Sequence, residues 1–164
     1  MNVDRFDPTL RAFKLGDGRT VLMWVTSDDE ARRWASLPAR PMSLEIFDRW
    51  HAEPGVRPYL FEISGVAVAY GEIWEDPDED EAELARLIVD PGRRGQGVGR
   101  ALARALLAEA RRLGWADVWL RVAPGNAPAL RAYAAAGFAR TNAGDEAAFN
   151  VCQPEAFVWM RAPT

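Results

Sequence analysis

A glycine- and arginine-rich segment, Arg94-Gly95-Gln96-Gly97-Val98-Gly99-Arg100, stands between a predicted strand and a predicted helix. Glycine lets the backbone turn tightly and lets a ligand approach it closely. The first turn of the following helix presents N–H groups without intrahelical acceptors, at the positive end of the helix dipole. Arg93, Arg94 and Arg100 add positive charge. The segment predicts an anion-binding loop suited to a pyrophosphate, although the same glycines could also serve only to make a tight turn.

Two well-known phosphate-binding loops are excluded, one by its residue types and the other by its spacing. A Walker loop needs Lys followed by Ser or Thr after its last glycine, and Arg100-Ala101 stand there. A dinucleotide fingerprint needs G-x-G-x-x-G, whereas the glycines here alternate with single residues. The sequence therefore indicates neither a P-loop nucleotide nor NAD as the ligand.

The elements that must position this loop follow from periodicity, caps and turn residues. Strands are expected over 20–25, 59–63, 66–74, 83–89, 117–122, 138–140 and 156–161, and helices from Ser27 to 34–37 (ending before Pro38), from Ser43 to Pro54, and over 98–113 and 128–136. Ser64-Gly65 predicts a hairpin turn, and residues 75–81 an acidic turn. Hairpin neighbours should be antiparallel and the central strand–helix–strand crossover parallel. The result is an α/β (α+β) fold with a mixed, mostly antiparallel sheet of about seven strands and helices on both faces.

Composition limits the classes of protein. A length of 164 residues predicts one domain, 1–164, and the net charge of -4 argues against nucleic-acid partners. No apolar run reaches the ~18 residues of a membrane span, and the N-terminus lacks a signal-peptide pattern, so a cytoplasmic protein is expected. With a single cysteine, Cys152, and a single histidine, His51, no metal site is expected. His51 is expected on the surface at a helix end.

Two motifs carry a resemblance to a known enzyme family. Arg94-x-x-Gly97-x-Gly99 is similar to the Gln/Arg-x-x-Gly-x-Gly/Ala signature of the GNAT superfamily of N-acetyltransferases. Asn126-x-x-Ala129-x-x-x-Tyr133, with the Ala-Gly-Phe that follows it, resembles the second motif of that family. The resemblance implies a GNAT fold, acetyl-CoA as the acyl donor, and an acyl-CoA cleft between the fourth and fifth strands.

The resemblance also implies roles for individual residues. The pyrophosphate of acetyl-CoA would be bound by the loop, through Arg94, Gly95, Gln96, Gly97, Val98, Gly99 and Arg100. The pantetheine arm and the acetyl carbonyl would contact the strand end Leu87, Ile88 and Val89. Asn126 would touch the arm, and Tyr133, about two helical turns further on and so on the same face, would protonate the sulfur as general acid. Without the motif, the residues would favour a structural role for Tyr133, as a ring that packs on an alanine-rich helix surface.

Two glutamates are candidates for the general base. The family often has a glutamate at the position of Glu83, and strand alternation places Glu83, Ala85, Leu87 and Val89 on one face. Glu72, flanked by Tyr70 and Trp74, is the second candidate. Some family members carry another glutamate where this chain has Arg121. That departure weakens a transfer of the ribosomal-protein N-terminal acetylase mechanism, and it leaves deprotonation by bulk water open.

The acceptor is indicated only as a class. Glu72, Trp74 and Trp34 are the expected acceptor-contacting residues, and the acidic turn would attract a cationic amine. Core tryptophans and a solvated turn are the alternatives. The resemblance implies transfer of acetyl from acetyl-CoA to a primary amine of a small molecule or peptide, by direct attack, in an enzyme that could form a homodimer. The alternatives are a non-catalytic CoA-binding sensor or regulatory domain, and transfer of a longer acyl group.

Overall fold

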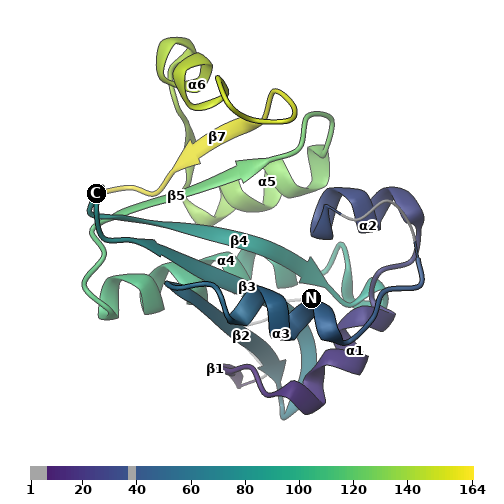
Figure 1. The fold of residues 1–164 in the computed structure, drawn as a ribbon. Helices are drawn as coiled ribbons and strands as arrows, with labels where there is room; N and C mark the ends of the chain where they lie inside the picture. Colours follow the sequence, from purple (N-terminus) through teal and green to yellow (C-terminus); the bar gives the residue numbers. More distant parts are fainter. Residues whose placement is uncertain (1–6, 37–39) are drawn as a thin grey trace.

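Strand pairing in a computed structural model, which describes residues 7–36 and 40–164, defines a seven-stranded sheet (Figure 1). Its order is β1-β2-β3-β4-β5-β7-β6. The strands are β1 Pro8–Ala12, β2 Val56–Ile63, β3 Val66–Asp76, β4 Glu81–Val89, β5 Asp117–Val122, β6 Ala139–Arg140 and β7 Val158–Arg161. Only β4 and β5 are parallel among the described neighbours, and the other pairs are antiparallel. The predicted mixed sheet of about seven strands is confirmed.

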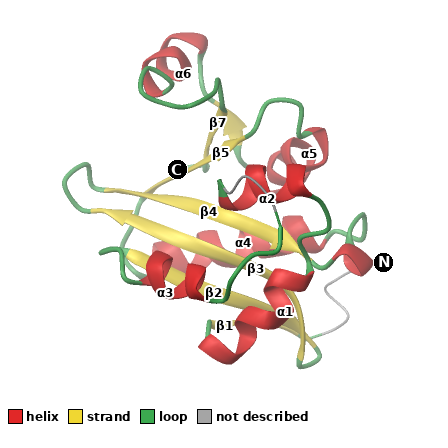
Figure 2. Cartoon of the chain, turned by 45° about the vertical axis from the view of Figure 1, so that its right-hand side comes forward, coloured by secondary structure: helices red, strands yellow, loops and turns green. Residues whose placement is uncertain are grey.

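Helices cover both faces of the sheet (Figure 2). They are α1 Gly18–Met23, α2 Asp28–Ala35, α3 Glu45–His51, α4 Val98–Arg112, α5 Ala127–Ala136 and α6 Ala143–Phe149, with short 3-10 turns at Leu15–Asp17 and Pro91–Arg93. The α4 face of the sheet buries one core, which includes Leu102, Leu106 and Leu120. The opposite face buries a second, aromatic core under α1, α2 and α3, which includes Trp34, Phe47 and Trp50.

One predicted strand is a helix. Residues 20–25 were expected to be extended because they are rich in β-branched and apolar residues, but α1 occupies Gly18–Met23. The buried positions are Val21, Trp24 and Val25. Their i, i+3, i+4 spacing is helical, and a short apolar run does not by itself distinguish a strand from a helix.

Several other predictions can be compared with the structure. The edge strand β1 and helix α6 were not predicted. The Ser64-Gly65 hairpin is confirmed, with both residues at positive φ. Ser27 caps α2 as expected, accepting from the Glu30 N–H at 3.1 Å. Leu37 and Pro38, where that helix was expected to end, lie outside the described residues.

Candidate functional site

Strands β4 and β5 pair for only three residues and then part. The parallel register runs from Glu81↔Asp117 to Glu83↔Trp119. Beyond it β4 continues to Val89, and β5 continues to Val122 while its other edge pairs antiparallel with β7. A parallel pair that separates leaves the backbone groups of the later β4 residues available to an extended ligand. The acyl-CoA cleft that the family resemblance implies was expected between these two strands.

The glycine loop lies at the end of β4 and opens α4. Gly95 and Gly97 have φ values of 74° and 85°, in the left-handed region that glycine tolerates. Gly97 is the N-cap of α4, and no side chain caps the helix there. A Cβ on Gly95 would meet nothing within 4 Å. The first-turn N–H groups of α4 therefore open toward an accessible loop, as an anion site requires.

Arg94 holds this loop in place. Its guanidinium donates to the Val89 carbonyl and to the Trp24 carbonyl, each at 3.0 Å, and forms a 2.7 Å ion pair with Glu30. The guanidinium of Arg94 thus connects the loop to β4 and to the α1–α2 segment. We interpret Arg94 as a residue that shapes the loop.

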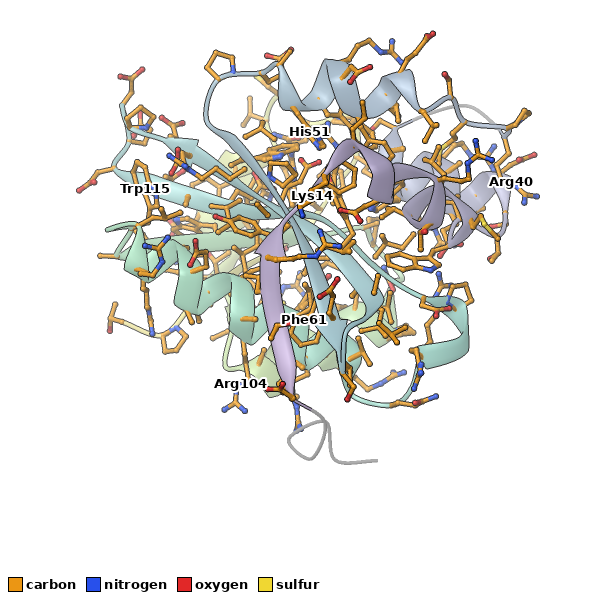
Figure 3. The ribbon with its side chains drawn as sticks, turned by 90° about the horizontal axis from the view of Figure 1, so that it is seen from below. Lys14, Arg40, His51, Phe61, Arg104 and Trp115 are labelled. Carbon is orange, nitrogen blue, oxygen red and sulfur yellow. The ribbon has the colours of Figure 1, made fainter. Side chains whose placement is uncertain are left out.

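Other predicted loop residues differ in what their side chains do. Gln96 donates to the Gly92 carbonyl at 3.1 Å, and Val98 is buried. A Cβ on Gly99 would lie 3.6 Å from that of Ala132, so α4 and α5 pack closely there. Arg100 lines a cavity of about 180 Å³ beside β1, together with Arg104 and Phe61, two residues that Figure 3 labels.

The second motif forms helix α5, which packs against α4. The Asn126 side chain caps α5 by accepting from the Ala129 N–H at 3.3 Å. Tyr133 lies two turns later and packs against the α4-side core, and it is half-buried. Burial raises the pKa of the Tyr133 hydroxyl to about 12, so the phenol holds its proton at neutral pH.

A bulge in β4 changes which residues share a face. Glu72 pairs with Ala85 and Tyr70 with Ile88, so Arg86 and Leu87 together face one residue of β3, and Arg86 has a φ of 49°. Trp34 of α2 fixes the bulge by donating its indole N–H to the Arg86 carbonyl at 2.7 Å.

The predicted face of β4 is therefore wrong in part. Leu87 and Val89 pack on the α4 side, whereas Ile88 lies in the aromatic core. Glu83 and Ala85 precede the bulge and face the aromatic-core side. Strand alternation fails here because the extra residue reverses the phase.

Glu83 lies at the last paired residue of β4, where the strands part. Its Oε1 is 2.9 Å from Nε of Arg121, an ion pair whose angle is too bent for a hydrogen bond. Burial raises the pKa of the Glu83 carboxyl to about 7, although the Arg121 guanidinium acts in the opposite direction. A carboxyl group that titrates near neutral pH is suited to take a proton from an amine.

Glu72, the second candidate base, is fully buried and already engaged. Its Oε1 accepts from the Tyr70 hydroxyl, and its Oε2 accepts from the Trp74 indole at 2.6 Å and from Arg86 Nη1 at 2.8 Å. The Arg86 guanidinium also stacks between the rings of Trp50 and Trp74. The geometry favours Glu83 over Glu72 as the group that meets a substrate.

The three residues that were expected to contact the acceptor all contact Arg86. Trp34 binds its carbonyl, Trp74 stacks on its guanidinium, and Glu72 forms the ion pair. Arg86 itself was missed, because nothing in the pattern of β4 marks a bulge.

His51 was expected on the surface but is largely buried. Its Nε2 lies 3.0 Å from the Tyr70 hydroxyl (Figure 3 shows it turned toward the interior). The α3 helix lies over the sheet, so the end of the helix faces the aromatic core. Burial lowers the pKa of the imidazole, against an opposing effect of Glu72.

No helix among residues 7–36 and 40–164 is long and apolar enough to traverse a bilayer. Over the same ranges, no three His, Cys, Asp or Glu side chains gather in a way that could hold a metal ion.

Several known acetyltransferases are similar to this chain in sequence. A mycothiol acetyltransferase of Streptomyces avermitilis is 39% identical over 100 residues, which is 61% of this chain and 31% of that protein. The [ribosomal protein bS18]-alanine N-acetyltransferase of Escherichia coli is 44% identical over 59 residues, 36% of this chain and 40% of that protein. The matched regions thus span less than half of these curated relatives.

A structure of the aminoglycoside acetyltransferase AAC(6')-Ib with coenzyme A shares the fold, with a TM-score of 0.74 at 22% identity over 94% of both chains. The sequence profile of the Acetyltransferase (GNAT) family matches residues 20–138, which include the glycine loop, Glu83 and Tyr133. The chain belongs to the GNAT acetyltransferase family.

Proposed function

We propose that this protein transfers an acetyl group from acetyl-CoA to a primary amine. The observation that carries the proposal is the separation of β4 and β5 just beyond Glu83, with the uncapped N-terminus of α4 at the end of the same strand. One extended ligand can follow the free edge of β4 and place its pyrophosphate on the loop. The residues fit such a ligand, because the loop is open at Gly95 and its helix end is uncapped.

The proposed reaction needs a base at the amine and an acid at the sulfur, and Glu83 and Tyr133 are assigned to these two roles. We assign Glu83 as the base, which takes a proton from the acceptor nitrogen directly or through a water molecule. The neutral amine attacks the thioester carbonyl, the carbon–nitrogen bond forms and the carbon–sulfur bond breaks. Tyr133 supplies a proton to the departing sulfur, and the nitrogen then loses its remaining extra proton to solvent, from which the phenolate of Tyr133 regains one. This assignment suits the two groups, because one titrates near pH 7 and the other keeps its proton.

Relatives in the comparisons support an amine acceptor. They include acetyltransferases named for aminoglycosides, for spermidine and for the alanine of a ribosomal protein. An acetylation screen over a panel of amines, monitored by release of free thiol, tests the proposal. Amine-dependent thiol release supports it. Tight binding of CoA without turnover of any amine would instead support the non-catalytic alternative, and faster reaction with longer acyl-CoAs would support the longer-chain alternative.

The role of Glu83 predicts a pH dependence. The carboxylate is the active form, so kcat/KM should rise with pH about tenfold per unit up to about 7 and then level with respect to this group. Glu83→Gln should lower kcat/KM at pH 8 by about 100-fold and remove that inflection. Glu79→Gln, in the exposed turn, is the matched control and should leave the profile unchanged. A wild-type inflection retained in Glu83→Gln would assign the proton to another group or to bulk water.

The loop predicts a charge effect on CoA binding. A negative side chain at Gly97 would face the pyrophosphate, so Gly97→Glu should weaken CoA binding about tenfold or more beyond Gly97→Gln. Both variants place a side chain at the same positive φ, so the strain is shared and the difference isolates the charge. Isothermal titration with CoA measures it. Equal affinities of the two variants would move the pyrophosphate away from this loop.

A further inference from the structure

Two arginines and several aromatic rings line the sheet on the side of Glu83. Arg86 stacks on Trp50 and Trp74, and the Arg121 guanidinium lies 5.3–5.7 Å from the ring centroids of Trp74, Phe157 and Trp159. Arg121 comes from β5, two residues beyond the last β4–β5 pair, so it stands where the strands separate. The aromatic contacts and a 2.7 Å hydrogen bond from its Nη1 to Gln153 hold the guanidinium in one orientation.

The two arginines differ in how their charge is used. Arg86 neutralises Glu72, which has no exposed surface. Arg121 faces Glu83, and these two side chains are 25% and 19% exposed, while the Glu83 Oε1 that lies toward Arg121 is buried. The Arg121–Glu83 pair is therefore less enclosed than the Arg86–Glu72 pair, and it stands where β4 and β5 part.

The acidic turn contributes less to this site than its composition indicates. Glu75 accepts from Arg57 at 2.6 Å and from the Trp115 indole at 3.0 Å. Asp76 accepts from two backbone N–H groups of its own turn. Two of the carboxylates that would favour a polycation are thus engaged within the protein, and an accessible cation stands beside the base.

We propose that the acceptor is an α-amino acid, whose carboxylate binds Arg121 while its amino group meets Glu83. The inference rests on the proposed acetyl transfer and names its substrate class. In an α-amino acid a single carbon separates the ammonium from the carboxylate. The ammonium can therefore face the carboxylate of Glu83 while the substrate carboxylate faces the adjacent guanidinium of Arg121. A guanidinium is a planar fork that binds carboxylates with two parallel hydrogen bonds. Because the rings already hold Arg121 in place, little side-chain entropy is lost on binding.

The test compares each amino acid with the same amine lacking the negative charge. Acetylation of L-alanine and L-phenylalanine is measured against their amides, and that of L-phenylalanine also against 2-phenylethylamine, at pH 9 where Glu83 is ionised. Wild type should favour the carboxylates in kcat/KM by about tenfold to 100-fold. Arg121→Gln should bring this ratio close to one, mainly through a higher KM for the amino acids, and Arg121→Lys should retain part of the preference.

The ratio of kcat/KM for the amino acid to kcat/KM for its amide distinguishes substrate recognition by Arg121 from a role in orienting Glu83. If Arg121 only orients Glu83, its loss should slow acids and amides alike and leave the ratio unchanged. Arg161→Gln is the matched control, because Arg161 also pairs with a carboxylate and lies over a tryptophan, Trp119, but stands outside the site. Its ratio should equal that of wild type. Equal or faster turnover of the amides by wild type would overturn the inference while leaving acetyl transfer intact, whereas CoA binding without turnover of any amine would overturn the proposed function itself.

Discussion

Replacement of Tyr133 by phenylalanine is expected to lower kcat by about 100-fold to 1,000-fold, with the affinity for CoA unchanged within about twofold. The ring packs on the core between α4 and α5, and phenylalanine keeps that packing. What is lost is one hydroxyl, whose proton would go to the sulfur. A thiol ordinarily has a pKa near 8.5, so the departing thiolate takes up a proton at neutral pH, and the donor in this proposal is the neutral phenol of Tyr133.

Steady-state kinetics and CoA titration on the same preparation check this result. Tyr59→Phe is a matched control, because burial also raises the pKa of Tyr59 to about 12 but its hydroxyl donates to Glu109, away from the site. That variant should keep the wild-type kcat. A Tyr133→Phe variant with undiminished kcat would remove Tyr133 as the acid and would leave proton delivery to water.

Replacement of Arg86 by methionine is expected to lower the free energy of unfolding by about 3 kcal/mol. Arg86 is the cation that neutralises Glu72, a carboxylate with no exposed surface. Removing one partner of a buried pair leaves the other charge without compensation. The contacts with Trp50 and Trp74 would lose their cation as well.

Urea unfolding of three variants measures this effect. The double variant Glu72→Gln/Arg86→Met removes both charges and should recover much of the loss, because no buried charge is then unpaired. Arg161→Met breaks an exposed pair with Asp117 and should cost less than about 1 kcal/mol. If Arg86→Met cost no more than Arg161→Met, the Glu72 cluster would not be a buried electrostatic element of the fold.

Local patterns were sufficient where neighbours in the chain decide the structure. Helix α4 follows from apolar residues at helical spacing, and α5 from the Asn126 cap and the closing Gly137, which has the positive φ that glycine adopts at a helix end. The loop glycines predicted the sharp turn between β4 and α4, and Ser64-Gly65 predicted the hairpin. Glu83 and Tyr133 became candidates through the resemblance to the family, by their distance along the chain from these same motifs, and their roles stay predictions.

The tertiary structure decided everything that depends on contacts distant in sequence. Residues 20–23 are helical, and Val21, Trp24 and Val25 bury one face in the aromatic core; local propensity alone does not distinguish a helix from a strand here. The bulge at Arg86 is held by Trp34, 52 positions away.

The sequence by itself determined the loop and the helices that flank it, because caps, glycines and periodicity act over a few residues. Only the tertiary structure decided which charges meet. The partners of Glu72 come from β3, β4 and α3 and leave it no exposed surface, whereas Glu83 pairs with Arg121 of the neighbouring strand β5 and both of these side chains stay partly exposed. The free energy of burying a charge depends on its surroundings in space, and those surroundings are assembled from segments far apart in the chain.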